Sequence, residues 1–193
     1  LGAIGIQPLT FVPTGVRAAR FERRDVSELV IFGAPGTFRT RVLGDGTLEW
    51  PEKISDAAEA WPVDLDYDGR DDLVLRFGED SLGLAFTSRD GEPGRVSSWL
   101  RGRWLASGDL DGDHRPEIAL ARSDGQVVIA WGGPHGLHAR VTETGLAVPV
   151  GDSRLLIANL ARGQASELVY VRAHRPEWGE SDAETDTITV FRV

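Results

Sequence analysis

The chain has 193 residues, of which 41% are hydrophobic, so it is long enough for one well-buried core and too short for two comfortable domains. Its formal net charge of −9 argues against nucleic acid or an anionic membrane as a partner, because the electrostatic contribution to such binding would be repulsive. The absence of cysteine excludes disulfides and thiolate metal sites.

The first predicted elements are a short strand at Gln7–Val12 and a loop that ends in an apolar strand. Positions 1, 3, 5 and 9 of this loop hold Arg20, Glu22, Arg24 and Glu28. With only two acids present, we expect no metal here. The two arginines can instead pair with the two glutamates, at a stability gain usually under about 1 kcal/mol.

The next two loops carry acids at the same four positions, and each precedes an apolar strand. The acids are Asp64, Asp66, Asp68 and Asp72 in one loop and Asp109, Asp111, Asp113 and Glu117 in the other. Ca²⁺ prefers six to eight oxygen ligands at about 2.3–2.6 Å, and alternate positions of a tight loop can point inward together. The backbone carbonyls of Arg70 and Arg115, at position 7, are natural further ligands. We therefore predict two Ca²⁺ sites, with a solvated acidic turn as the alternative for each loop.

These loops differ from the EF-hand, because the last acid stands at position 9 and a strand follows it. A fourth loop holds Asn159, Ala161, Gly163 and Glu167 at the four positions, so no Ca²⁺ is expected there. The four final acids are 44, 45 and 50 residues apart, a spacing that indicates a repeat architecture. Three or four short strands per repeat, with Gly/Asp turns between them, are typical of propeller blades. The predicted blades lie approximately at 14–52, 53–100, 101–143 and 144–193 of a single all-β domain, 1–193.

The two acidic loops, Phe32-Gly33-Ala34-Pro35 and the segment from Trp131 to Leu137 (WGGPHGL) together resemble the FG-GAP/VCBS repeat of integrin-α-like β-propellers. The resemblance is specific over residues 60–137 and weak elsewhere. It implies a calcium-stabilised propeller, usually extracytoplasmic, whose calcium is structural. Family members commonly have about seven blades, whereas this chain offers four.

Closure of a four-blade ring needs a final strand, because the fourth repeat ends before its outermost strand. Gln7–Val12 has the right length to supply that strand and to cover an edge that would otherwise invite pairing. The alternative is a half ring completed by another subunit.

No constellation of residues predicts catalysis. The four histidines form no spaced set with acids, and no serine lies in a nucleophile-elbow context. Trp50 and Trp178, each flanked by Pro and Glu, are the tryptophans most expected to be exposed, and exposed aromatics anchor partners or stack on sugars. Trp178 lies in an acidic insertion with Glu180 and Asp182, which predicts a basic protein partner if this segment is more than a solvated loop.

The sequence therefore predicts a non-catalytic propeller that serves as a protein-protein interaction scaffold or accessory subunit of a larger assembly. The alternatives are a carbohydrate-binding lectin and a non-catalytic part of a polysaccharide-active protein. Calcium sites of modest affinity fill where the ion is near millimolar, which favours a periplasmic, secreted or cell-surface location reached through a removed signal peptide. Leu1–Ile6 is too short and too soon broken by Pro8 to span a membrane.

Overall fold

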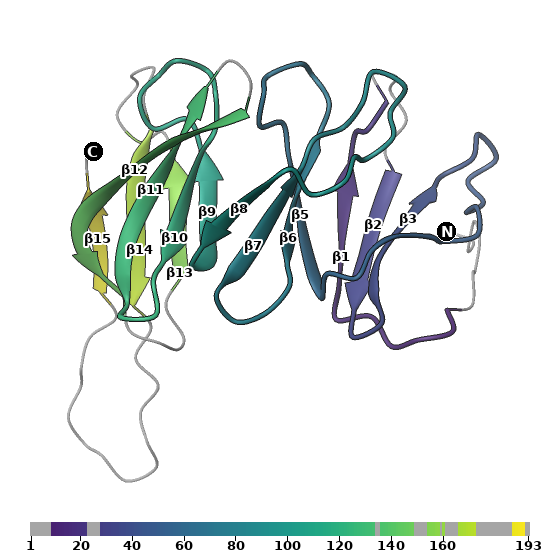
Figure 1. Ribbon diagram of the computed structural model, residues 1–193, viewed down its shortest axis with the longest axis horizontal. Helices are drawn as coiled ribbons and strands as arrows, with labels where there is room; N and C mark the ends of the chain where they lie inside the picture. Colours follow the sequence, from purple (N-terminus) through teal and green to yellow (C-terminus); the bar gives the residue numbers. More distant parts are fainter. Residues whose placement is uncertain are drawn as a thin grey trace, which may run out of the picture. The chain divides into compact units, whose positions relative to one another are not determined.

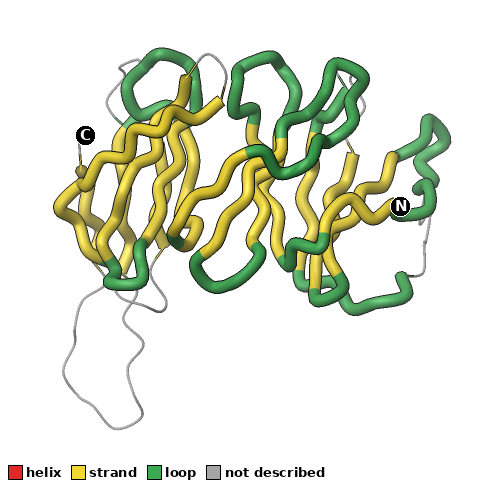
Figure 2. Tube along the Cα trace, viewed as in Figure 1, coloured by secondary structure: helices red, strands yellow, loops and turns green. Residues whose placement is uncertain are grey.

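The computed structural model describes residues 9–22, 28–133, 136–148, 154–158, 160, 166–172 and 187–191. The chain divides into two compact units, Leu1–Gly102 and Arg103–Val193. The part of the chain that the structure describes contains strands and loops and no helix (Figure 2). These strands form four antiparallel sheets, which confirms the all-β class predicted from the sequence.

The first unit opens with a four-stranded sheet in which each strand pairs with the next along the chain (Figure 1). Its strands are β1 (Gly15–Ala19), β2 (Glu28–Gly33), β3 (Gly36–Arg41) and β4 (Glu52–Ser55). Gly36 closes the turn between β2 and β3 with φ +129°, where an added Cβ would lie 2.4 Å from the Ser55 carbonyl oxygen. Glu28, the first residue of β2, stands opposite Arg41 in the register.

The second sheet of this unit repeats the same up-and-down order. Its strands are β5 (Glu59–Val63), β6 (Asp72–Arg76), β7 (Ser81–Ala85) and β8 (Ser98–Arg101). One hydrophobic core joins the two sheets, with Val30 and Phe32 from the first, Phe21 from the loop after β1, and Leu73 and Leu75 from the second. Each of these five side chains is at most 3% exposed, so burial of apolar surface holds the first unit together.

The second unit holds the remaining two sheets. One contains β9 (Arg103–Gly108), β10 (Glu117–Ala121), β11 (Gln126–Gly133) and β12 (Gly136–Ala147), and the other contains β13 (Arg154–Ala158), β14 (Glu167–Arg172) and β15 (Thr187–Phe191). A second core joins them through Ile129, Leu155 and Leu168. The backbone of Gly108 approaches Ile157 so closely that an added Cβ would lie 2.6 Å from its Cγ2 atom.

The predicted closing strand at 7–12 is described only in part. Residues 9–12 belong to no strand, and Gln7 and Pro8 lie outside the described residues. Phe11 stacks on Phe38 of β3, with ring centroids 4.6 Å apart. The described part of this segment therefore packs on the first sheet of its own unit. Closure of a ring, by this segment or by another subunit, stays a prediction. No helix in the described residues is long and apolar enough to cross a membrane.

Candidate metal centres

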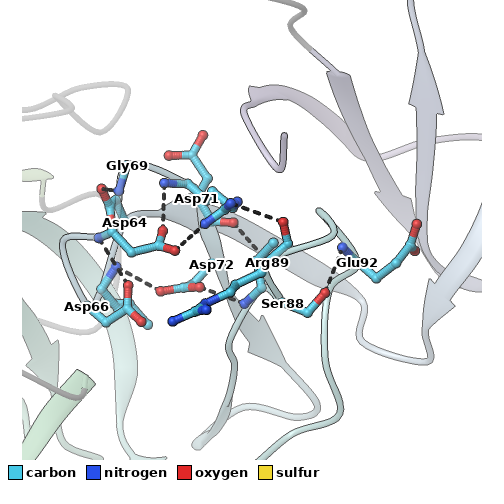
Figure 3. Close-up of polar contacts among 12 residues, drawn as sticks. Asp64, Asp66, Gly69, Asp71, Asp72, Ser88, Arg89 and Glu92 are labelled. Carbon is cyan, nitrogen blue, oxygen red and sulfur yellow. Dashed lines mark hydrogen bonds and ion pairs between the residues drawn. The ribbon is translucent and has the colours of Figure 1, made fainter. Parts of the chain in front are cut away.

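The loop that joins β5 to β6 gathers three carboxylates in one place. Asp64, Asp66 and Asp72 each offer an oxygen, and these oxygens all lie within 4.8 Å of one another. Figure 3 shows the three side chains pointing toward a common space. This is a set of hard oxygen donors at a separation that a single divalent cation can span.

Asp72, at position 9, connects the cluster to the sheet. It is the first residue of β6, and its side chain is buried, with the residue only 1% exposed. Its Oδ2 accepts a hydrogen bond from the Leu65 N–H at 3.0 Å, and its Oδ1 accepts one from the Thr87 N–H at 2.7 Å. The carboxylate thus satisfies two buried backbone donors and connects the loop to β6 and to the segment that follows β7.

Asp64 and two left-handed residues shape the rest of this loop. The Asp64 carboxylate accepts hydrogen bonds from the N–H groups of Asp68 at 3.0 Å and Gly69 at 2.9 Å. Tyr67 has φ +59° and Gly69 has φ +87°, a conformation that costs little only for glycine and for residues held by such local bonds. These bonds fold the chain tightly enough to bring position 1 beside position 9.

The loop between β9 and β10 reproduces this arrangement in the second unit. Asp109, Asp111 and Glu117 offer oxygens within 4.8 Å of one another. The buried Glu117 accepts from the Leu110 N–H at 2.6 Å and from the Gly132 N–H at 3.2 Å. The longer glutamate side chain therefore accepts a hydrogen bond from the N–H at loop position 2, as Asp72 does in the other loop. The two clusters share the same contacts between the final acid and the backbone.

Asp68 and Asp113, predicted as ligands at position 5, are not members of these two clusters. The Asp68 carboxylate forms an ion pair with the Arg70 guanidinium. Asp113 lies 3.4 Å from Nη1 of Arg115, measured from its Oδ2 atom. Each arginine stands two residues after its aspartate. Its guanidinium therefore competes with a metal ion for that carboxylate. Coordination by the carbonyls of Arg70 and Arg115 stays a prediction.

Burial and like charge make both clusters costly to ionise without a cation. Burial raises the pKa of Asp72 to about 7, with the neighbouring carboxylates of Asp66 and Asp64 adding to the effect. Burial also raises the pKa of Asp66, and Asp68 raises it further. The pKa of Glu117 is raised by burial and by the charges of Asp111 and Asp113. A bound divalent cation would reverse this penalty by stabilising the ionised forms.

These pKa shifts predict how the effect of calcium depends on pH. The Asp72 carboxyl group, whose pKa is raised by folding, keeps its proton in the native state up to about pH 7, whereas the unfolded chain loses that proton near pH 4. Metal-free protein should therefore lose stability as pH rises between these values, because the native state binds more protons than the unfolded state. Calcium binding requires the proton to leave, so its affinity should increase over the same range.

We expect the gap in melting temperature between calcium-containing and EDTA-containing buffer to widen from pH 5 to pH 8. Thermal melting at constant ionic strength, with NaCl matched to the added CaCl₂, measures this gap. An equal gap at pH 5 and pH 8 would show that these carboxyl groups bind no metal.

Arginines lie beside the buried final acid of the first loop, but they are different arginines from those predicted. Glu28 is 1% exposed and pairs with Arg39, whose Nε lies 3.3 Å from Oε2, and with Arg41, whose Nε lies 3.5 Å from Oε1. Arg41 also pairs with Glu22 at 3.1 Å. Glu28 and Glu22 thus form ion pairs with arginines of β3 and not with the predicted Arg20, and Arg24 lies outside the described residues.

The fourth loop keeps the buried acid as well. Glu167 is 5% exposed, and its Oε2 accepts a hydrogen bond from the Leu160 N–H at 2.9 Å. Asn159, Ala161 and Gly163 lie outside the described residues. The final acid of this loop thus has the same backbone contact with position 2 as in the two acidic loops.

Within each unit, backbone bonds connect one loop to the next. In the first unit the Asp71 N–H donates to the Arg20 carbonyl at 2.7 Å, and the Arg20 N–H donates to Asp71 Oδ2 at the same distance. In the second unit the Ser166 N–H donates to the Asp109 carbonyl at 2.9 Å. All three bonds join position 8 of one loop to position 1 of the preceding loop. These hydrogen bonds were not predicted from the sequence, although the nearly constant spacing between successive loops could have indicated that neighbouring loops contact one another.

Of the residues predicted to bind a partner, only Trp50 lies in the described part of the chain. It follows β3 in the loop before β4 and is 71% exposed. Trp178, Glu180 and Asp182 lie outside the described residues.

No family model and no curated protein matches this sequence. The structure is similar to that of a lectin from Agrocybe aegerita, which was solved to explain its specific recognition of non-reducing terminal N-acetylglucosamine. The TM-score is 0.61 and the sequences are 18% identical, over 81% of this chain and 46% of the lectin chain. This chain therefore spans less than half of that lectin. At this identity the likeness shows a shared fold.

Proposed function

We propose that this protein is a non-catalytic, calcium-stabilised binding protein whose four sheets are the blades of a β-propeller of the FG-GAP/VCBS type. The observation that carries the proposal is the pair of three-carboxylate clusters at equivalent positions in two sheets, each between the first and the second strand of its sheet. Each cluster contains one buried acid that holds both its loop and its sheet. A cation there would fix the turns from which the strands begin, and it would take no part in a reaction.

Carbohydrate is the ligand class that we favour for this binding protein. Support comes from the fold that it shares with the N-acetylglucosamine-recognising lectin, although fold alone does not determine function. Exposed aromatic side chains add to this support, because aromatic rings offer flat apolar faces for sugar rings. The net charge of −9 is compatible with neutral sugars as ligands.

A role as a scaffold for other protein subunits is the second candidate. It is favoured by Trp50, a large apolar side chain 71% exposed on a loop, which is the residue type most enriched at the centres of protein interfaces. The acidic composition would suit a partner with a basic surface. Both candidates fit an extracytoplasmic location, where calcium is near millimolar.

A glycan array probed with the fluorescently labelled protein in 2 mM CaCl₂ separates the two candidates. The carbohydrate proposal predicts selective binding to a related group of glycans, with a loss of signal in EDTA as the blades loosen. Absence of glycan binding, together with co-purification of a stoichiometric protein partner from the native source, would support the scaffold candidate and contradict the lectin one.

A further inference from the structure

An aromatic pair lies on the outer part of the second sheet in the first unit. Phe77 directly follows β6, and Trp99 lies in β8, the edge strand of the sheet. The register places Trp99 opposite Gly83 of β7, and Gly83 opposite Leu75 of β6. Because side chains alternate between the two faces of a sheet, Trp99 and Gly83 lie on the same face as Leu75 and Phe77.

The inner part of this face is covered and its outer part is open. Leu75 is 2% exposed and belongs to the core shared with the first sheet. Phe77 is 39% exposed and Trp99 is 58% exposed, although both are large and apolar. The aromatic pair therefore borders the packed interior of the unit and leaves part of its own surface in water.

The two rings form a supported platform. Their centroids are 5.1 Å apart and their planes are inclined by 55°, a tilted arrangement that aromatic pairs prefer. Gly83 makes room beneath them, because an added Cβ would lie 2.9 Å from Cε2 of Phe77 and 2.8 Å from Cγ1 of Val96. Phe77 and Val96 thus fill the space that a side chain at position 83 would occupy, and Phe77 supports the indole from one side.

The size of this platform favours a small ligand over a protein. A fully buried aromatic side chain covers about 150–250 Å², so these two partly covered rings offer at most a few hundred Å². A stable protein interface buries about 800 Å² on each partner. One or two sugar rings match the available area much better than a protein surface does.

Polar groups next to the platform suit sugar hydroxyls. Arg101 lies two residues after Trp99 in β8, on the same face, and is exposed. Its register partner Ser81 is partly exposed. A guanidinium offers up to five N–H donors, and a hydroxyl can both donate and accept. An apolar ring face bordered by a few such groups is the usual composition of a small-ligand site.

We propose that Trp99, supported by Phe77, is a stacking site for a neutral hexopyranose with equatorial substituents, such as a β-linked N-acetylglucosamine residue. Such a sugar presents a flat C–H face to the indole while its hydroxyl groups reach Arg101 and Ser81. This assignment rests on the proposed carbohydrate-binding function and gives that function a location.

Titration with N,N′-diacetylchitobiose in 2 mM CaCl₂, followed by isothermal titration calorimetry and by tryptophan fluorescence, tests the assignment. Trp99→Ala should weaken binding at least tenfold, and Phe77→Ala should weaken it less, because it removes the support and leaves the indole. Trp99→Phe should retain part of the affinity. Leu43→Ala is the control, since it removes an exposed apolar side chain from the loop after β3 of the first sheet and should leave affinity unchanged.

Thermal melting of each variant shows whether a loss of binding is local, and an unchanged melting temperature is expected for Trp99→Ala. If the native chain binds chitobiose or another array glycan and Trp99→Ala binds it equally well, the platform is not the site, while the carbohydrate-binding function stands. If the native chain binds no glycan, both the platform assignment and the carbohydrate-binding function are contradicted.

Discussion

Removing calcium is expected to lower the melting temperature of this protein by roughly 5–10 °C. At free calcium ten times the Kd, each site would contribute about 1.4 kcal/mol to the free energy of unfolding. For a chain of this length, 1 kcal/mol corresponds to a shift of about 2–4 °C. The physical source of the shift is relief of repulsion among buried and half-buried carboxylates, which burial and mutual charge make costly to ionise.

Two substitutions remove one site each with little other change. Asp66→Asn and Asp111→Asn keep the oxygen that accepts the N–H of Asp68 at 3.2 Å or of Asp113 at 3.1 Å, and each deletes one charge. Each variant should lose about half of the calcium-dependent shift, and the double variant should lose all of it.

The control for these variants is Asp45→Asn, in an exposed turn where Asp45 accepts the Thr47 N–H at 2.9 Å outside either cluster. This control should keep the full shift. Equal melting temperatures with and without calcium in the native protein, or a full shift in the double variant, would refute the metal sites.

Arg39→Met is expected to lower the free energy of unfolding by about 3–5 kcal/mol, because it leaves a buried carboxylate without its main partner. Arg39 is 5% exposed, and it donates from Nη1 to the Gly91 carbonyl at 2.9 Å in addition to pairing with Glu28. Burial already raises the pKa of Glu28, and Arg39 is the largest influence that opposes this rise. Urea unfolding measures the change.

An exposed ion pair in the same sheet provides the control for Arg39. Lys53 pairs with Asp56 at 2.7 Å, with side chains 46% and 85% exposed, so Lys53→Met should change stability by less than about 1 kcal/mol. Adding Glu28→Gln to Arg39→Met should recover part of the loss, because the uncompensated charge is gone. A cost below about 1 kcal/mol for Arg39→Met alone would mean that Glu28 does not depend on Arg39 for its counter-charge.

The two acidic clusters could be predicted from the sequence because the spacing of the acids along each loop is enough to bring them together. Positions 1, 3 and 9 of the two loops meet because left-handed residues and Asp64 or Asp109 close the turn locally. The all-β class was predictable for a similar reason, since the loops recur at a nearly constant interval and each one precedes an apolar strand.

Contacts between side chains were harder to predict than spacing. Asp68 and Asp113 stand at ligand spacing, yet arginines two residues later attract them, and only the backbone carbonyls of those arginines entered the prediction. Glu28 likewise pairs with Arg39 and Arg41, which are distant in sequence and adjacent across β2 and β3. A search for basic residues at cross-strand positions, once the hairpin had been predicted, would have found this pair.

The aromatic pair was missed for a different reason. Phe77 and Trp99 are separated by 22 residues, and only the register of β6, β7 and β8 brings them onto one face above Gly83. A glycine inside a strand, opposite an aromatic residue, was the available signal, because it marks close approach of another group.

Calorimetric titration of the metal-free protein with CaCl₂ tests the central claim most directly, because it counts the sites. The account predicts two calcium ions per chain for the native protein, one for Asp66→Asn, one for Asp111→Asn, and none for the double variant. No heat of binding up to several millimolar calcium, or a count that these substitutions leave unchanged, would contradict it.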